Sequence, residues 1–323
     1  MLHHIVIAVY QDFELLDATG PASVFASANH ALSEDGMPAY YAVHLASPNG
    51  GAVQSSSGVV VETKVLTQGP RAVDTILVAG AEAGAVTAAA QTPALRRWLS
   101  QSASSVRRIG SVCAGTFVLA AAGLVNGKRV ATHWSACELL ARLYPSLTVD
   151  ADALYVIDGN VWTSAGVTTG IDMALAMISE DLGSAIASRV AKRLVLYARR
   201  PGYQSQFSPL LRAQAKADGP FDDLLVWAQA NLDAALDVPR LAAKVGLSER
   251  TFHRRFVAAI GETPAQYIET VRLDAARILL AQKLPLKEIA RRVGLVPVAR
   301  FTRVFQRRFG VTPRLFRETH TSK

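Results

Sequence analysis

The stretch of sequence that decides the fold occurs twice in the last third of the chain, first as LAAKVGLSERTFHRRFVAAIGETP (residues 241–264) and then as IARRVGLVPVARFTRVFQRRFGVTP (residues 289–313). Both copies contain Val-Gly-Leu, two phenylalanines four residues apart, a glycine and Thr-Pro in the same order. The offset is 48 residues up to Leu247 and Leu295, and 49 from Phe252 and Phe301 onward. Each copy predicts a short helix, a glycine-containing turn and a second helix, which is the helix-turn-helix pattern. Two copies predict two major-groove contacts from one subunit.

Charge divides the chain at the same place. Residues 219–323 carry 18 Lys and Arg against 10 Asp and Glu, whereas residues 1–218 carry 16 of each, so the whole net charge of +8 belongs to the repeat-containing part. A basic part joined to a neutral part is typical of proteins that bind the phosphate backbone of nucleic acids. Taken alone, the excess positive charge is as consistent with a solvated surface that maintains solubility.

The second helix of each copy, predicted at 249–259 and 298–309, supplies candidate DNA contacts. Ser248 is the predicted N-cap of the first of these helices, and Asp237 is the predicted N-cap of the helix before it. The paired phenylalanines, Phe252 with Phe256 and Phe301 with Phe305, are predicted to face the core, which leaves the basic residues between them outside. Arginine can bond guanine through two acceptors, and threonine can meet a thymine methyl. The predicted DNA-binding residues are Arg250, Thr251, His253, Arg254, Arg300, Thr302, Arg303 and Arg307. We expect Arg307, with Arg308 and Arg314, to hold phosphates rather than read bases.

Residues 221–318 resemble the DNA-binding domain of AraC/XylS-type transcription regulators. The resemblance rests on the paired copies, on Arg272-Leu273 and Leu279-Leu280 in the segment between them, and on the ending Phe305-x-x-x-Phe309-Gly310-x-Thr312-Pro313-x-x-Phe316-Arg317. The second turn, residues 294–298, departs from this family: it has Leu where an aromatic is usual, and it lacks the usual Ser or Asp.

Residues 1–182 alternate short β-branched runs with Ala-rich helical stretches. This order predicts an α/β fold with a mostly parallel sheet covered on both faces. The predicted strands are 4–9, 41–46, 59–62, 75–78, 106–112, 129–132, 154–157 and 161–164. The predicted helices are 14–32, 93–102, 115–122, 135–143, 170–182 and 184–200. We predict a first domain at 1–200, a linker at 201–220 rich in Gln, Ser, Pro and Gly, and an all-α domain at 221–323.

The clearest local signal in the first domain is Ile109-Gly110-Ser111-Val112-Cys113-Ala114-Gly115-Thr116. An apolar strand runs here into a small-residue turn that opens a helix, and a cysteine at such a turn lies near the helix N-terminus, where a thiolate is stabilised. The alternative is a buried cysteine that packs as a small apolar side chain. Asp17, just after the first strand, and His133, after the strand ending at Thr132, are its candidate partners. Taken alone, an acid such as Asp17 is more often a helix cap, and a histidine such as His133 is more often a core residue.

These segments together resemble the ThiJ/PfpI-like branch of the class I glutamine amidotransferase-like superfamily over residues 3–183. The resemblance implies a doubly wound, flavodoxin-like sheet. The matching motifs are Leu16-Asp17-x-Thr19-Gly20-Pro21, Val78-Ala79-Gly80, Ser111-Val112-Cys113-Ala114-Gly115, Thr132-His133-Trp134, Thr163-Ser164-Ala165-Gly166 and Gly170-Ile171-Asp172. The Asp17 and Cys113 pair is most similar to isonitrile hydratases. The resemblance implies that Cys113 is the nucleophile position, Asp17 its acidic partner, and Ala114 with Gly80 or Ala81 the backbone N–H groups that face the pocket.

A ThiJ/PfpI-like domain before paired AraC-type motifs is the arrangement of GlxA-family regulators, and the resemblance covers nearly the whole chain. It implies a cytoplasmic, sequence-specific transcription regulator, expected to be an activator and a homodimer. Its expected partners are double-stranded DNA, a small effector of the amine or amino-acid-derivative class bound at the Cys113 pocket, and RNA polymerase.

Alternatives remain open from the residues alone. The chain could be a cysteine-dependent enzyme of the isonitrile hydratase or amidase class with a DNA-targeting domain, or a redox sensor with a low-pKa Cys113. No P-loop, zinc-type spacing, signal peptide or membrane-spanning run is present in the sequence, so no cofactor, metal or membrane is expected.

Overall fold

The computed structural model describes residues 2–68, 72–196, 200, 202, 221–282, 284–309 and 311–320. The chain divides into two compact units, residues 1–206 and 207–323. This boundary falls within the predicted linker at 201–220, which lies outside the described residues apart from Gly202. The exact domain limits therefore stay a prediction.

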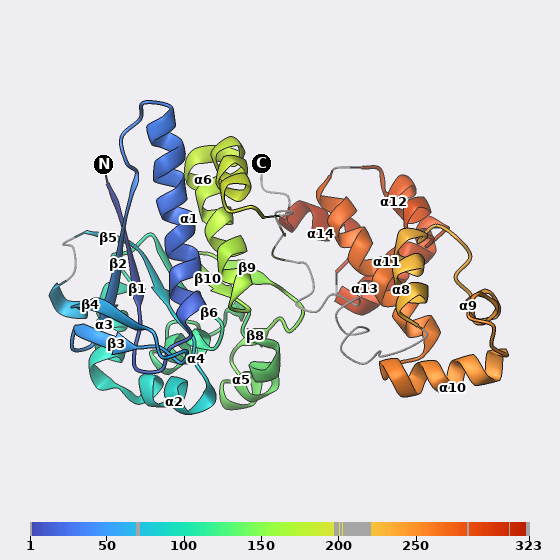
Figure 1. Ribbon diagram of the computed structural model, residues 1–323, viewed down its shortest axis with the longest axis horizontal. Coiled ribbons are helices and arrows are strands. Elements are labelled where there is room, and N and C mark those ends of the chain that lie inside the picture. Colours follow the sequence, from blue (N-terminus) through green and yellow to red (C-terminus); the bar gives the residue numbers. More distant parts are fainter. Residues whose placement is uncertain are drawn as a thin grey trace. The chain divides into compact units, whose positions relative to one another are not determined.

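The first unit is built on an eight-stranded sheet in the order β3-β4-β2-β1-β5-β6-β10-β9 (Figure 1). The strands β4, β2, β1, β5, β6 and β10 are parallel to their neighbours, and β3 and β9 are added antiparallel at the two edges. The bounds are β1 His3–Ala8, β2 Tyr41–Ser47, β3 Gly51–Gln54, β4 Val60–Val65, β5 Val73–Val78, β6 Arg108–Val112, β9 Tyr155–Asp158 and β10 Val161–Ser164. A separate two-stranded sheet pairs β7 (Arg129–Val130) with β8 (Thr148–Val149).

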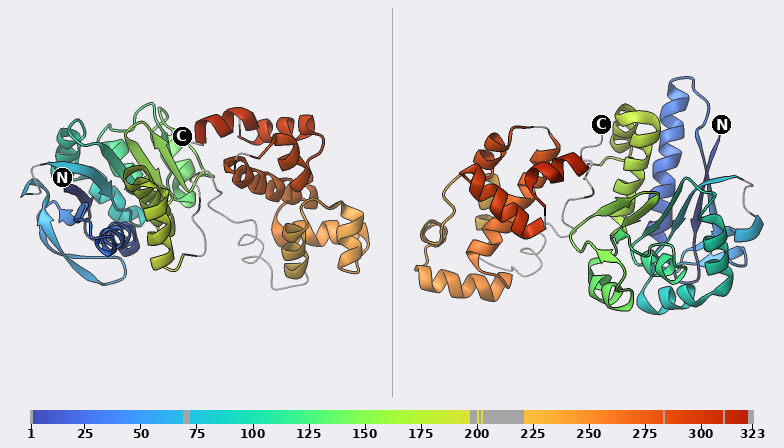
Figure 2. Two further views of the ribbon diagram at one scale, coloured as in Figure 1. Left: turned by 90° about the horizontal axis from the view of Figure 1, so that it is seen from above. Right: turned by 180° about the vertical axis from the view of Figure 1, so that it is seen from behind.

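Helices cover the sheet on both faces, as the alternating pattern predicted. The long helices α1 and α6 pack against each other on one face, while α2, α3 and α4 pack together on the other (Figures 1 and 2). The bounds are α1 Leu15–Glu34, α2 Ala83–Gln91, α3 Pro93–Ser102, α4 Gly115–Ala121, α5 Cys137–Leu143 and α6 Thr168–Arg193, with short 3-10 turns η1 Leu66–Gln68 and η2 Trp134–Ala136. The central strands β1 and β5 are buried between these layers. The prediction of a doubly wound, flavodoxin-like sheet is therefore confirmed.

The two helices expected at 170–182 and 184–200 are both present within α6, and the non-helical Gly183 (φ 85°) divides them as predicted. Two predicted elements are shorter than expected. The second of these helices ends at Arg193 rather than before Arg200, because Leu194 caps it and Val195 has a left-handed φ of 55°. The strand predicted at 129–132 stops at Val130. Helix α2 and strands β3 and β8 were not predicted.

The described part of the second unit is helical. Its elements are α8 Asp222–Ala230, α9 Val238–Lys244, α10 Glu249–Ile260, α11 Pro264–Ala281, α12 Leu286–Arg292, α13 Val298–Phe309 and α14 Pro313–His320. The pair α9–α10 forms the first helix-turn-helix motif and α12–α13 the second, with α11 connecting them (Figure 1). The second recognition helix has the predicted bounds, although its turn lacks the usual capping residue and contains a cis Val296–Pro297 bond.

Separate aromatic clusters hold the two motifs. Phe252 and Phe256 contact Phe221 and Tyr267 in the first motif. In the second, Phe305 contacts its three aromatic neighbours Phe301, Phe309 and Phe316. The repeated phenylalanines are thus core residues, and each motif packs around its own apolar centre.

Helix caps in the first motif are local. The Asp237 carboxylate accepts the Arg240 N–H at 3.0 Å, and the Ser248 hydroxyl accepts the Thr251 N–H at 3.4 Å. Thr263 and Gln266 form a capping box at the start of α11. These short polar side chains satisfy N–H groups that a helix start leaves unpaired, which fixes where α9, α10 and α11 begin.

Candidate functional sites

Cys113 lies at the junction between β6 and α4, at the carboxyl edge of the sheet. Its φ of 57° is left-handed, which costs energy for a residue with a Cβ and is held here by hydrogen bonds on both sides. Its N–H donates to the Ser164 carbonyl at 3.0 Å, and its carbonyl accepts the Thr132 hydroxyl at 3.0 Å. The sharp strand-to-helix turn predicted for Cys113 is therefore present, and the side chain is 9% exposed.

Cys113 fits into its position because two neighbouring residues, Gly80 and Gly166, have no side chain. A Cβ on Gly166 would lie 2.4 Å from the Cys113 Cβ, and one on Gly80 would lie 2.6 Å from it. Gly166 also has a φ of 109°, a region that other residues rarely adopt. Any side chain at Gly166 would displace the cysteine.

Asp17 is fully buried beside Cys113. Its Oδ1 accepts the Val167 N–H at 2.7 Å and its Oδ2 accepts the Gly80 N–H at 3.0 Å. Burial raises the pKa of Asp17 to about 7, although the two N–H donors and the Cys113 thiol oppose the shift by hydrogen bonding to the carboxylate. Near neutral pH the site therefore holds a mixture of carboxylic acid and carboxylate.

The thiol of Cys113 is not activated in this environment. Burial raises its pKa well above the usual range, and the charge on Asp17 raises it further, while the Ala114 N–H gives partial compensation. A redox sensor needs a low-pKa thiol, so the redox-sensor hypothesis has no support from this geometry.

The predicted backbone donors and His133 are only partly brought together. The Ala114 N–H faces the Cys113 sulfur as expected, but the Gly80 N–H is directed to Asp17 and so is not available to a ligand. His133 Nδ1 bonds the Ser135 hydroxyl at 2.8 Å, and within the described residues no hydrogen bond joins this histidine to Cys113 or Asp17. Burial lowers the pKa of His133.

Tyr10 and Val167 belong to the same site and were not predicted. The Tyr10 hydroxyl donates to the Ala79 carbonyl at 2.9 Å, and its electrostatic neighbours are Asp17 and Cys113. Val167 has a left-handed φ of 49° and gives Asp17 its shorter hydrogen bond. Backbone N–H groups carry no signature in a sequence, although the neighbouring Thr163–Gly166 motif marked the right loop.

The predicted DNA-contacting residues lie on one exposed side of each recognition helix. On α10, Arg250, His253 and Arg254 are exposed, while Thr251 is half-buried and its hydroxyl accepts a hydrogen bond from Ser248 at 3.0 Å. On α13, Arg300 and Arg303 are exposed and Thr302 is half-buried.

Arg307 has a carboxylate partner in the structure. Its Nη2 lies 2.6 Å from the Glu269 carboxylate, so it connects α13 to α11. An arginine paired with a carboxylate has less charge to offer a phosphate. The role of Arg307 in holding a phosphate stays a prediction.

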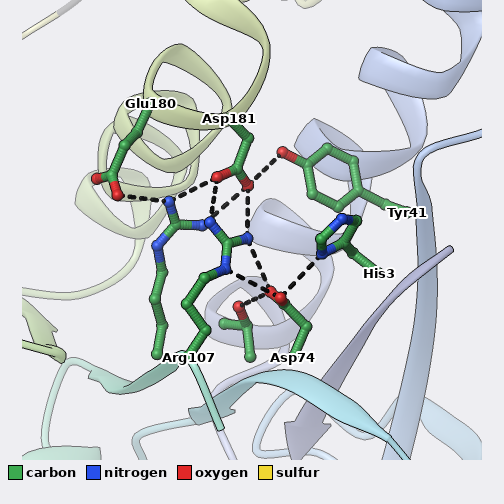
Figure 3. Close-up of polar contacts among 8 residues, drawn as sticks. His3, Tyr41, Asp74, Arg107, Glu180 and Asp181 are labelled. Atoms are coloured by element: carbon green, nitrogen blue, oxygen red, sulfur yellow. Dashed lines mark hydrogen bonds and ion pairs between the residues drawn. The ribbon is translucent and has the colours of Figure 1, made fainter. Parts of the chain in front are cut away.

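A second polar cluster lies at the opposite, amino edge of the sheet. Asp181 of α6 accepts hydrogen bonds from Arg107, Arg108 and Tyr41, and Asp74 accepts from Arg107 and His3 (Figure 3). Burial would raise the pKa of Asp181, but the two guanidinium groups outweigh it and hold that pKa well below its usual range. The cluster fastens α6 to four strand ends, far along the strands from Cys113, and we assign it a structural role.

Comparison with known proteins agrees with this geometry. The DJ-1/PfpI family matches residues 3–180, and a helix-turn-helix domain matches residues 241–319. The HTH-type transcriptional regulator GlxA of Rhizobium meliloti is 32% identical over 86% of this chain and 85% of its own length. The chain therefore belongs to the family of HTH-type transcriptional regulators to which GlxA belongs, with a DJ-1/PfpI domain before its helix-turn-helix domain.

The first unit has further relatives. An isonitrile hydratase of Pseudomonas putida is 34% identical over 61% of this chain and 79% of its own length. The crystal structure of Drosophila melanogaster DJ-1beta is 25% identical, with a TM-score of 0.53 over 61% of this chain and all of that one. Among the described residues, no helix is long and apolar enough to cross a membrane.

Proposed function

We propose that the protein is a cytoplasmic, homodimeric transcription activator that reads a two-part DNA site with α10 and α13. The observation that carries this proposal is the pair of helix-turn-helix motifs, each with exposed arginines near its turn, in the part of the chain that holds all the excess positive charge. Two motifs on one subunit should cover two consecutive major grooves, about 10 base pairs apart. Activation would require contact with RNA polymerase, and transcription in a purified system tests the sign of regulation.

The buried Asp17 carboxyl beside Cys113 supports control by a small molecule. An effector of the amine or amino-acid-derivative class would pair its cation with the Asp17 carboxylate and lower the pKa of this group. Binding at pH 7 would then release a proton. Calorimetry of candidate amines in buffers of different ionisation enthalpy measures this release, and binding without it would argue against pairing with Asp17.

The contacts around Val167 offer a route from the pocket to the start of the linker. Asp17 holds the Val167 N–H, and the next residue, Thr168, accepts a hydrogen bond from the Arg200 guanidinium at 2.9 Å. Arg200 also binds Asp172 in the first turns of α6, with 2.6 Å between Nη2 and Oδ2. The carbonyl of Gly202 accepts the Leu154 N–H at 2.6 Å. A change at Asp17 would thus be felt where the chain leaves the first unit.

The homodimer is proposed from the neutral, apolar-rich first unit, which suits a dimerisation domain for a DNA-binding protein. Sedimentation of the full chain with and without its DNA tests this. A monomer under both conditions would refute the dimer and leave the two-motif DNA contact unaffected.

A second candidate function is favoured by the turn at Cys113. The strained, left-handed cysteine beside an acid, together with the isonitrile hydratase relative, suits a cysteine-dependent hydratase or amidase. Replacement Cys113→Ser separates the two functions. An enzyme would lose turnover of isonitriles or amides, whereas a regulator would keep promoter control. Burial and the raised thiol pKa favour the regulator.

A further inference from the structure

We propose that Arg272 is the positioning residue that sets the distance between the two DNA elements this protein recognises. The inference rests on the proposed two-part DNA site and names the side chain that fixes its geometry. Arg272 lies on α11, the helix that connects the two helix-turn-helix motifs, and only 8% of it is exposed.

Arg272 joins the entrance of the first motif to the turn of the second. Its Nε donates to the Leu232 carbonyl at 3.1 Å and its Nη2 to the Ala234 carbonyl at 2.7 Å, both in the segment that leads into α9. The same guanidinium packs on Gly294, in the turn between α12 and α13. We call Leu232, Ala234, Arg272 and Gly294 the arginine clamp.

Gly294 shows how closely the motifs approach at the clamp. A Cβ on Gly294 would lie 2.3 Å from the Leu232 carbonyl oxygen and 2.7 Å from the Arg272 Nη2. Its φ of 63° also favours glycine. The turn of the second motif therefore rests directly on the entrance loop of the first, and no side chain can be placed between them without a shift.

Beside the clamp the two motifs are separated by an open groove of about 710 Å³. Its walls include Asp237 at the start of α9, Val296 in the second turn and Arg300 at the start of α13, and Arg272 forms part of its lining. Because the motifs do not fill this groove, their relative orientation depends on the clamp, on apolar contacts with α11 and on the exposed Arg307–Glu269 pair. Exposed ion pairs contribute little to stability, whereas buried hydrogen bonds from a charged donor contribute more.

A fixed orientation has a direct consequence for DNA recognition. One base pair inserted between two elements moves the second by about 3.4 Å and turns it by about 35° around the duplex axis. A rigid pair of recognition helices cannot follow both changes, so the wild-type protein should reject altered spacings. Loss of the clamp should make it tolerant.

The test uses the full chain and the duplex that the wild-type protein selects, with one or two base pairs inserted or removed between the two elements. Arg272→Lys keeps the charge and loses the forked contact to the two carbonyls. For the wild type, Kd should be higher at an altered spacing than at the original one. We expect Arg272→Lys to reduce the ratio of these two Kd values by about tenfold, which is the scale of one or two charge-assisted hydrogen bonds. Arg292→Lys, at an exposed arginine of α12, is the matched control and should keep the wild-type ratio.

A measurement without DNA separates this inference from the proposed function. Spin labels attached at Ala258→Cys on α10 and Gln306→Cys on α13 report the distance between the recognition helices. Both positions are exposed, whereas both native cysteines are buried and should not take up the label. We expect a narrow distance distribution for the wild type and a broader or shifted one for Arg272→Lys and for Gly294→Ala. An unchanged distribution in both variants would overturn the role of Arg272, as would an equal loss of affinity at every spacing. Failure of the wild-type protein to select DNA would refute the proposed function instead.

Discussion

Asp17 is the residue on which the chemistry of the first unit depends. It is the buried acid that contacts Cys113, and its two oxygens hold the loops that end at Gly80 and Val167. Its pKa of about 7 places the change of charge at physiological pH, so that ligand or proton can alter the same two hydrogen bonds.

Asp17→Asn should remove a pH dependence of stability. The pKa of Asp17 in the folded protein lies above its ordinary value of 3.8, so the contribution of this group is full below about pH 4 and is lost as pH rises through 7. The wild type should therefore lose on the order of a few kcal/mol relative to the asparagine variant between pH 4 and pH 8, at about 1.4 kcal/mol per pKa unit.

Urea unfolding followed by tryptophan fluorescence measures this loss. A Trp227→Phe background confines the signal to Trp98, Trp134 and Trp162 of the first unit. Glu82→Gln, at an exposed carboxyl near the same sheet edge, is the control. Parallel pH profiles for wild type and Asp17→Asn would contradict the raised pKa.

At the residue level, the sequence could predict Cys113 and Asp17 because both occur in compact motifs next to strand ends. It could not predict that the Gly80 N–H is consumed by Asp17, or that His133 bonds Ser135, because these depend on side-chain and backbone direction. The role of Val167 comes from its N–H alone, and any residue type could have supplied that.

Helix α6 runs from the carboxyl edge of the sheet, where Cys113 lies, to the opposite, amino edge. Its first turns contact Arg200, and its middle carries Asp181 of the buried ion cluster (Figure 3). The two sets of contacts make separate predictions, one about signal transfer and one about stability.

Asp17→Ala should loosen the contacts of Gly202 if the route through Val167 and Arg200 operates. The amide hydrogens of Leu154 and Tyr155, which bond the Gly202 carbonyl, should exchange at least several-fold faster, as they should in Arg200→Ala. Hydrogen exchange with mass spectrometry of the full chain reads this segment. Glu62→Gln, at an exposed carboxyl on β4 on the other side of the sheet, is the control. Unchanged protection of the Leu154 and Tyr155 amides in Asp17→Ala would show that Asp17 is not coupled to the start of the linker.

Asp181→Asn should destabilise the first unit by about 3 kcal/mol, because it removes the buried carboxylate partner of the Arg108 guanidinium and leaves the exposed Glu180 carboxylate to balance that charge. The folded-state pKa of Asp181 is lowered, so its contribution is present above about pH 4 and is lost as pH falls. The difference between wild type and variant in urea unfolding should therefore shrink in acid. A loss below 1 kcal/mol at pH 7 would mean that the cluster is solvated.

Helices whose apolar residues recur with a regular period, or that start at a clear capping residue, could be predicted from the sequence. Helices and strands without these signals could not. The amphipathic helix α13 was found with its bounds, and Asp237 and Ser248 correctly marked the starts of α9 and α10. Helix α2 was missed because its Ala- and Gly-rich sequence has no apolar period, and strand β3 because Gly51 begins it. Ile278 of α11 is apolar but exposed, because the burial of Arg272 and Arg277 shifts the inner face of that helix.

The whole molecule keeps the Cys113 site and the helix-turn-helix motifs in separate units. The neutral first unit holds Asp17 and Cys113, and the basic second unit holds both recognition helices, with the clamp at Arg272 between the two motifs. Charge and repeat were visible in the sequence, and so this division was predictable. The contact between Gly294 and Leu232 was not, because it joins two motifs that each look self-contained.

Selection of duplexes from a random DNA pool, followed by affinity against salt concentration, is the measurement that tests the regulator function most directly. We predict enrichment of two elements about 10 base pairs apart and a steep fall in affinity with salt, since several arginines would neutralise phosphates. Recovery of no common motif, with weak binding of every duplex alike, would contradict sequence-specific reading by α10 and α13.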